Sequence, residues 1–223
     1  MRSFDVPEFY RSPIIARVKQ KRKVRDPRKR DFSPSMLDFG TVRFVMARHF
    51  GFCFGVENAI EIAYRALEEN PGKRIFLLSQ MIHNPEVNED LTSQGIRFLQ
   101  DTEGNNLTPL SELNADDVVL IPAFGTTLEL EEQLKTIGVD ISRYNTTCPF
   151  VEKVWMRSAK LATSDYTIVI HGKPEHEETR ATFSHASGSG QALVIKNMSE
   201  AEVLCEFIEG KLPLDTFWTH FEG

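Results

Sequence analysis

The stretch TVRFVMARHFGFCFGVENAIEIAYRALEENPGKRIFLLS, residues 41–79, decides the fold. Its two ends, residues 41–47 and 74–79, are short apolar runs of the kind that form buried strands. Between them, apolar residues such as Val56 and Ile60 recur at helical spacing and so share one face of a helix. The stretch therefore predicts a β-α-β unit whose two strands lie parallel in one sheet.

The same alternation of strands and helices continues along the chain. Further strands are expected at 96–99, 117–123, 166–172 and 192–196, with helical patterns between and after them. This order predicts an α/β fold with mostly parallel sheets and with functional groups at the carboxyl ends of the strands. We divide the chain into an arm at 1–40, a first α/β unit at 41–140 and a second at 141–223.

The composition of the chain is typical of a globular protein with a hydrophobic core. The chain has 223 residues, of which 41% are hydrophobic, so it can bury a substantial core. The longest apolar runs are too short to cross a bilayer, and the N-terminal residues do not resemble a secretory signal. We therefore expect a cytoplasmic protein with no membrane partner. Three cysteines cannot all pair within one chain, and no secreted disulfide pattern is present.

The net charge of −6 is distributed unevenly. Residues 1–40 hold 11 of the 26 Lys and Arg but only 5 of the 32 Asp and Glu. The basic run at 16–31 has few aromatic residues and no periodic apolar face, so nucleic-acid binding is the weaker interpretation. We expect a solvated basic arm that packs against the acidic remainder of the chain.

Two cysteines carry the strongest chemical signal. Cys53 in GFCFGVENAI and Cys148 in NTTCPFVEKVW each follow an apolar strand pattern and precede a helical one. Each sulfur would thus lie near a helix N-terminus, where unpaired N–H groups favour a thiolate. Gly51 and Gly55 flank the first cysteine and allow a bulky cofactor to approach the backbone. We expect the two cysteines to converge on one metal centre.

Two histidines follow strands in a similar way. His83 comes after the strand that ends near residue 79, and His176 after the strand that ends near residue 171. A loop histidine alone is usually a surface residue, but two in equivalent positions indicate a shared site. Glu178 is a candidate proton donor, whereas Glu175 and Glu177 are more simply explained as solvated charges at a helix start.

The third cysteine has a different setting. In SEAEVLCEFIEG, Cys205 shares helical spacing with Ala201, Leu204 and Ile208. This pattern predicts a core thiol on the buried face of an amphipathic helix rather than a metal ligand.

The ordered strings GFCFGVENAI, MIHNPEV, PAFGTT, NTTCPFVEKVW and HGKPEHEETRAT resemble the 4-hydroxy-3-methylbut-2-enyl diphosphate reductase (LytB) family, in its cyanobacterial and plastid subtype. The resemblance implies an oxidoreductase of the methylerythritol phosphate route to isoprenoids. Such an enzyme removes the allylic hydroxyl of its substrate and yields isopentenyl and dimethylallyl diphosphate. The family fold is three α/β units around a 4Fe–4S cluster, and a one-electron donor such as ferredoxin or flavodoxin is implied.

The resemblance also assigns roles to residues. Cys53 and Cys148 match the first and second cluster ligands. His83 and His176 match histidines that contact the diphosphate substrate, and Glu178 matches the acid that protonates the departing hydroxyl.

The match departs from the family pattern in two places. Phe124 stands where many bacterial members carry another diphosphate-binding histidine. The sequence also lacks the QTT segment, the third cluster cysteine and the Ser-x-Asn loop. Two of the three family units are therefore expected, and the chain is interpreted as a truncated form. The alternatives are a truncated remnant that binds without catalysis, and a zinc-binding α/β protein that uses both loop cysteines and both histidines.

Overall fold

A three-stranded parallel sheet forms the centre of the molecule in the computed structural model, which describes residues 10 and 12–221. Its strands are β3 (Ile75–Leu77), β4 (Arg97–Phe98) and β5 (Val118–Leu120), in the order β4-β3-β5. In its register, Phe76 lies opposite Arg97 on one side and Val119 on the other. The predicted α/β fold with mostly parallel strands is confirmed.

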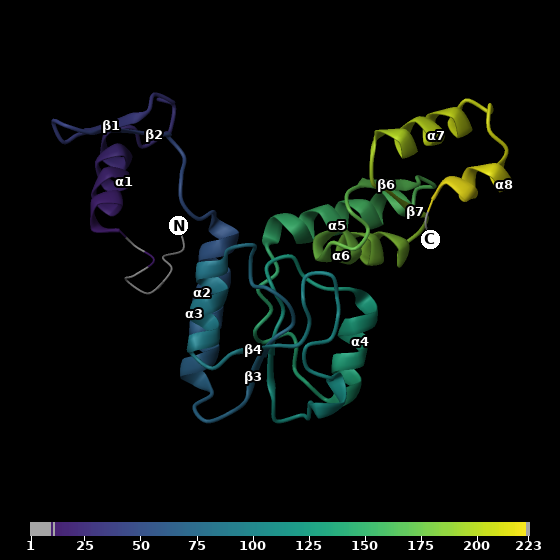
Figure 1. Ribbon diagram of the computed structural model, residues 1–223, viewed down its shortest axis with the longest axis horizontal. Helices are drawn as coiled ribbons and strands as arrows, with labels where there is room; N and C mark the ends of the chain where they lie inside the picture. Colours follow the sequence, from purple (N-terminus) through teal and green to yellow (C-terminus); the bar gives the residue numbers. More distant parts are fainter. Residues whose placement is uncertain (1–9, 11, 222–223) are drawn as a thin grey trace.

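Helices cover both faces of this sheet, which explains why its strands are continuous apolar runs. Helices α2 (Phe54–Glu69) and α3 (Pro85–Ser93) lie on one side, and α4 (Leu128–Ile137) lies on the other (Figure 1). A short 3-10 helix, η2 (Leu110–Glu112), precedes β5. Each face has its own apolar cluster, and residues such as Ile60, Leu77 and Leu134 are fully buried.

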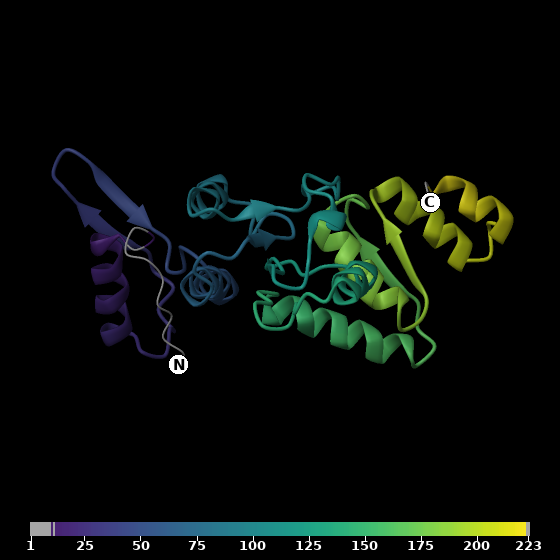
Figure 2. The same cartoon turned by 90° about the horizontal axis from the view of Figure 1, so that it is seen from below.

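A second, smaller parallel sheet follows along the chain. It pairs β6 (Ile168–His171) with β7 (Ala192–Ile195). Helices α5 (Pro149–Ala162) and α6 (Glu177–Ser187) lie on one side of it (Figure 2). On the other side lie three C-terminal helices: α7 (Met198–Ile208), α8 (Leu214–Phe217) and the 3-10 helix η3 (Trp218–His220).

The N-terminal part differs from the expectation. The strand predicted at 41–47 is present as β2 (Arg43–Met46), but it pairs antiparallel with β1 (Ser35–Asp38). It therefore belongs to a hairpin and not to a β-α-β unit with β3. Its partner is local because Gly40, with φ at +82°, turns the chain between the two strands.

The basic run forms helix α1 (Pro13–Arg25), which has no buried residue. Its Arg22 pairs with Asp31 at 3.1 Å, and Arg48 pairs with Asp26 at 3.3 Å. These carboxylates lie in the same N-terminal segment, so the segment neutralises part of its own charge. Helix α1 and the hairpin project to one side of the central sheet (Figure 1). No helix among the described residues is long and apolar enough to cross a membrane.

Candidate functional site

The two loop cysteines occupy equivalent positions in the fold. Cys53 is the N-cap of α2 and Cys148 is the N-cap of α5, and neither uses its sulfur to cap the helix. A Cβ placed on Gly55 would lie 2.5 Å from the Sγ of Cys148 and 3.8 Å from the Sγ of Cys53. The two sulfurs therefore meet beside Gly55, although 94 residues separate them in the sequence.

Backbone hydrogen bonds bring Cys148 to this point. After α4 the chain returns beside β5, where the N–H of Thr146 donates to the carbonyl of Ile121 at 3.0 Å. The N–H of Cys148 then donates to the carbonyl of Ala123 at 2.9 Å. The segment thus runs along the carboxyl end of β5 as an extra parallel partner, which fixes where α5 begins.

The two candidate histidines also converge. The ring centroids of His83 and His176 are 4.9 Å apart, and His83 stacks on Phe124 with a centroid distance of 4.5 Å. These three rings come from the loops after β3, β5 and β6. Partial burial lowers the pKa of His83, and the neighbouring His176 lowers it further. This pair gives the site two imidazoles within reach of one ligand.

His176 has a second task as the N-cap of α6. The backbone N–H of Glu178 donates to its Nδ1 at 3.3 Å. Because Nδ1 accepts, a neutral His176 carries its proton on Nε2, which can donate to a ligand. The carboxylate of Glu178 is exposed in the first turn of the same helix. This hydrogen bond ties His176 to the backbone of Glu178 at the start of α6.

The interpretation of Glu177 as a solvated charge is wrong. Its side chain is only 5% exposed. The hydroxyl of Ser79, beyond the end of β3, donates to its Oε2, and its Oε1 lies 3.4 Å from Nε2 of His83. Burial raises its pKa to about 7. The sequence could not signal this, since both contacts come from a segment more than ninety residues earlier.

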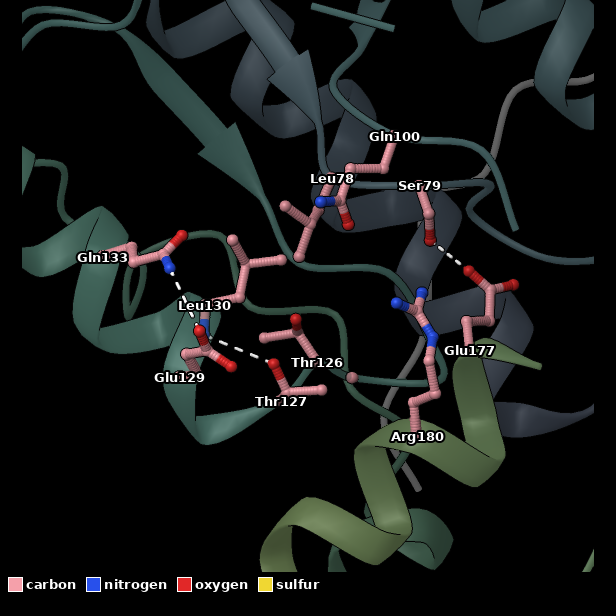
Figure 3. A pocket seen from close by; sticks show the side chains of 11 residues that line it. Leu78, Ser79, Gln100, Thr126, Thr127, Glu129, Leu130, Gln133, Glu177 and Arg180 are labelled. Atoms are coloured by element: carbon pink, nitrogen blue, oxygen red, sulfur yellow. Dashed lines mark hydrogen bonds between the residues drawn. The ribbon is translucent and has the colours of Figure 1, made fainter. Parts of the chain in front are cut away.

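A cavity of about 190 Å³ lies beside this carboxylate. Figure 3 shows the side chains of Glu177 and Arg180 entering it from α6, while Ser79 reaches in from the opposite side. The remaining wall includes Thr126 and Thr127 at the start of α4. The cavity therefore lies between the central sheet and the second unit, and Glu177, the neighbour of His83, is part of its wall.

The prediction that Cys205 is buried is wrong, because Cys205 is exposed on α7. The apolar cluster of the second sheet uses Ala201, Val203, Leu204 and Phe207 of this helix instead. Among the residues that the structure describes, no group of three or more His, Cys, Asp or Glu side chains is placed to hold a metal ion.

Comparison with known proteins points to one family. The model of the LytB protein family matches residues 44–214. A 4-hydroxy-3-methylbut-2-enyl diphosphate reductase of Synechococcus sp. (strain WH7803) is 37% identical over 83% of this chain and 45% of its own length. The protein of that name from Crocosphaera subtropica is 39% identical over 82% of this chain and 44% of its own length.

Two solved structures share the fold. One, described as (E)-4-hydroxy-3-methyl-but-2-enyl diphosphate reductase, the terminal enzyme of the non-mevalonate pathway, aligns with a TM-score of 0.56 and 27% identity. The alignment covers 67% of this chain and 50% of that one. The E-1-hydroxy-2-methyl-but-2-enyl-4-diphosphate reductase from Plasmodium falciparum aligns with a TM-score of 0.58 and 24% identity, over 68% of this chain and 44% of that one.

Proposed function

Because the chain belongs to the LytB family, we propose that it supplies cluster ligands, substrate contacts and the proton donor of a 4-hydroxy-3-methylbut-2-enyl diphosphate reductase. It spans about 45% of the length of the curated relatives that it matches. The observation that carries the proposal is the meeting of Cys53 and Cys148 beside Gly55.

The donor set fits part of an iron–sulfur cluster. Thiolates are the ligands that hold 4Fe–4S clusters, and two of them face one point here. A glycine at position 55 matters because a side chain would fill the space beside both sulfurs. We assign Cys53 and His83 to the unit at 41–140, and Cys148, His176 and Glu178 to the unit at 141–223.

His83 and His176 are proposed to hold the diphosphate of the substrate. Their rings lie side by side, and the Nε2–H of His176 is available because its Nδ1 already accepts from the backbone. Phe124 stacks on His83 and limits how that ring can turn. Two imidazole donors suit an anionic ligand, particularly when one carries a positive charge.

Glu178 is proposed as the general acid. A cluster held by Cys53 and Cys148 would supply single electrons and Lewis acidity. Glu178 lies in the first turn of α6 beside His176, so its carboxyl group can protonate the hydroxyl as it leaves as water. The electrons are proposed to come from a one-electron donor such as ferredoxin or flavodoxin.

Anaerobic reconstitution with iron and sulfide tests the cluster assignment. We expect a brown protein whose visible absorption and iron content both fall strongly in Cys53→Ser and in Cys148→Ser. Cys205→Ser is the matched control, because that thiol is exposed on α7, away from the two N-caps, and should leave loading unchanged. Equal loading of all three variants would exclude the assignment. A colourless, metal-free wild type would favour a binding remnant.

A further inference from the structure

Glu177 is a buried acid that the proposed reaction does not use. Its carboxylate lies between the second unit and the loop that follows β3, with Ser79 on Oε2 and His83 near Oε1. The hydroxyl of Ser79 fixes one oxygen and so aims the other at the imidazole (Figure 3 shows the Ser79 contact). If Glu177 served only to join the two units, its carboxylate would not need to face His83, which is proposed to bind the ligand.

The second carboxylate oxygen of Glu177, Oε1, indicates what the side chain does. Oε1 is buried and accepts no hydrogen bond from any residue that the structure describes, although Nε2 of His83 lies 3.4 Å away. A buried carboxyl oxygen without a hydrogen-bond partner is costly, and a small rotation of His83 would bring Nε2 into hydrogen-bond contact with it. Buried His–carboxylate contacts of this kind fix the tautomer and the orientation of an imidazole.

We propose that Glu177 is a positioning residue that hydrogen-bonds Nε2 of His83 and hands it a proton when an anion binds. The proton passes from Oε1 of the carboxylic acid to Nε2, which leaves a carboxylate and an imidazolium, with no net uptake of protons. His83 then presents its Nδ1–H to the anion. The identity of that anion as a diphosphate rests on the proposed function.

The surrounding charges support such a transfer. Burial raises the pKa of Glu177 to about 7 and lowers that of His83 below its usual value, so without a ligand the shared proton resides on the acid. The groups that face the pair are Ser79 on Glu177, His176 beside His83, and Arg180 and Glu178 on α6. A bound anion beside the two histidines would tip the balance towards the imidazolium.

Nuclear magnetic resonance of the histidine ring nitrogens tests the contact directly. The full chain, labelled with ¹⁵N, is titrated with pH, and His83→Ala assigns the signals. We expect Glu177→Gln to shift the titration of His83 to lower pH, because an amide cannot become a carboxylate beside the imidazolium, and to change the chemical shifts of its ring nitrogens. Glu175→Gln, an exposed acid just before the same helix, is the control and should change neither. An unchanged His83 titration in Glu177→Gln would overturn the proposal.

Inorganic pyrophosphate separates this inference from the proposed function. We expect Glu177→Gln to weaken its binding by about tenfold at neutral pH, the order expected for one charge-assisted hydrogen bond. If His83→Ala binds pyrophosphate as well as wild type does, His83 does not hold the diphosphate and that part of the proposed function fails. The spectra recorded without ligand still test the contact between Glu177 and His83.

Ser79→Ala is the second variant, should Glu177→Gln fold poorly. This variant keeps the carboxylate of Glu177 but removes the hydrogen bond to its Oε2. The titration of His83 should therefore also shift to lower pH, by a smaller amount than in Glu177→Gln. A folded Ser79→Ala protein with wild-type His83 spectra would also contradict the proposal.

Discussion

The two ends of the central sheet each hold a buried carboxylate, and they use it in opposite ways. At the amino end, Asp117 precedes β5 and pairs with Arg74 through two contacts, one of them 2.7 Å long. At the carboxyl end, Glu177 faces a hydroxyl and a histidine and has no cation in hydrogen-bond contact among the described residues.

The pKa values of the two acids reflect this difference. Burial alone would raise the pKa of Asp117, but the hydrogen bonds and charge of Arg74 lower it below its usual value. Burial raises the pKa of Glu177 to about 7. The comparison teaches that the amino end of this sheet is built for stability, whereas the carboxyl end keeps an acid that can exchange its proton.

Removing the acid at the amino end should have the largest effect. Asp117→Ala removes three hydrogen bonds to a buried carboxylate, two from Arg74 and one from the N–H of Asn114, so the free energy of unfolding should fall by about 4 kcal/mol. Chemical denaturation measures this, with Asp116→Ala as the exposed control. The histidine spectra of the folded protein should stay unchanged, and a change there would break the division between the two ends.

The acid at the carboxyl end, Glu177, should make the free energy of unfolding depend on pH. The pKa of Glu177 rises from 4.5 to about 7 on folding, so the folded state holds a proton that the unfolded state releases between these values. Stability should therefore decrease as pH rises from 4.5 to 7, by about 3 kcal/mol from this group.

The measurement is the difference between wild type and Glu177→Gln across that range of pH. The Gln variant cannot titrate at this position, so its stability curve should lack this decrease. If the stability of the two proteins changed with pH in the same way, Glu177 would not be the group that takes up the proton. The contrast with Asp117 would then be lost.

A neighbouring acid at the same end is expected to affect turnover rather than folding. Glu178→Gln keeps the shape of the side chain but removes its transferable proton. Under the proposed function, turnover of the allylic diphosphate should fall by about 100-fold, while the iron content stays the same. Glu175→Gln is the control, and normal turnover in Glu178→Gln would exclude the general-acid role.

The smallest effect is expected for the hydroxyl that anchors Glu177. Ser79→Ala removes one buried hydrogen bond, so the free energy of unfolding should fall by about 1 kcal/mol. Ser93→Ala, at an exposed position on α3, is the control. A loss as large as that of Asp117→Ala would mean that the carboxyl end is also built mainly for stability.

The sequence predicted the sheet well because burial on both faces leaves a clear pattern. The apolar runs around Phe76 and Val119 mark β3 and β5, and flanking helical periods mark α2 and α4. The pairing of β2 was predicted wrongly, since an apolar run indicates a strand but does not identify its partner.

The site was predictable only where its residues lie in local patterns. Cys53 and Cys148 were expected before helices, and they are the N-caps of α2 and α5. Glu177 and Cys205 were misjudged because their burial depends on distant elements. Glu177 is covered by the loop after β3, and α7 turns its other apolar residues inward. The catalytic role of Glu178 stays a prediction.

The meeting of the two sulfurs beside Gly55 has a consequence for synthesis on the ribosome. Cys53 leaves the exit tunnel first, and 94 further residues separate it from Cys148. At about 5–20 residues per second, roughly 5–20 s pass between the two. During this interval Cys53 has no second sulfur beside it, so the proposed pair of metal ligands is complete only after α5 has formed. The order of synthesis thus leaves Cys53 as a lone thiol, open to oxidation, for several seconds.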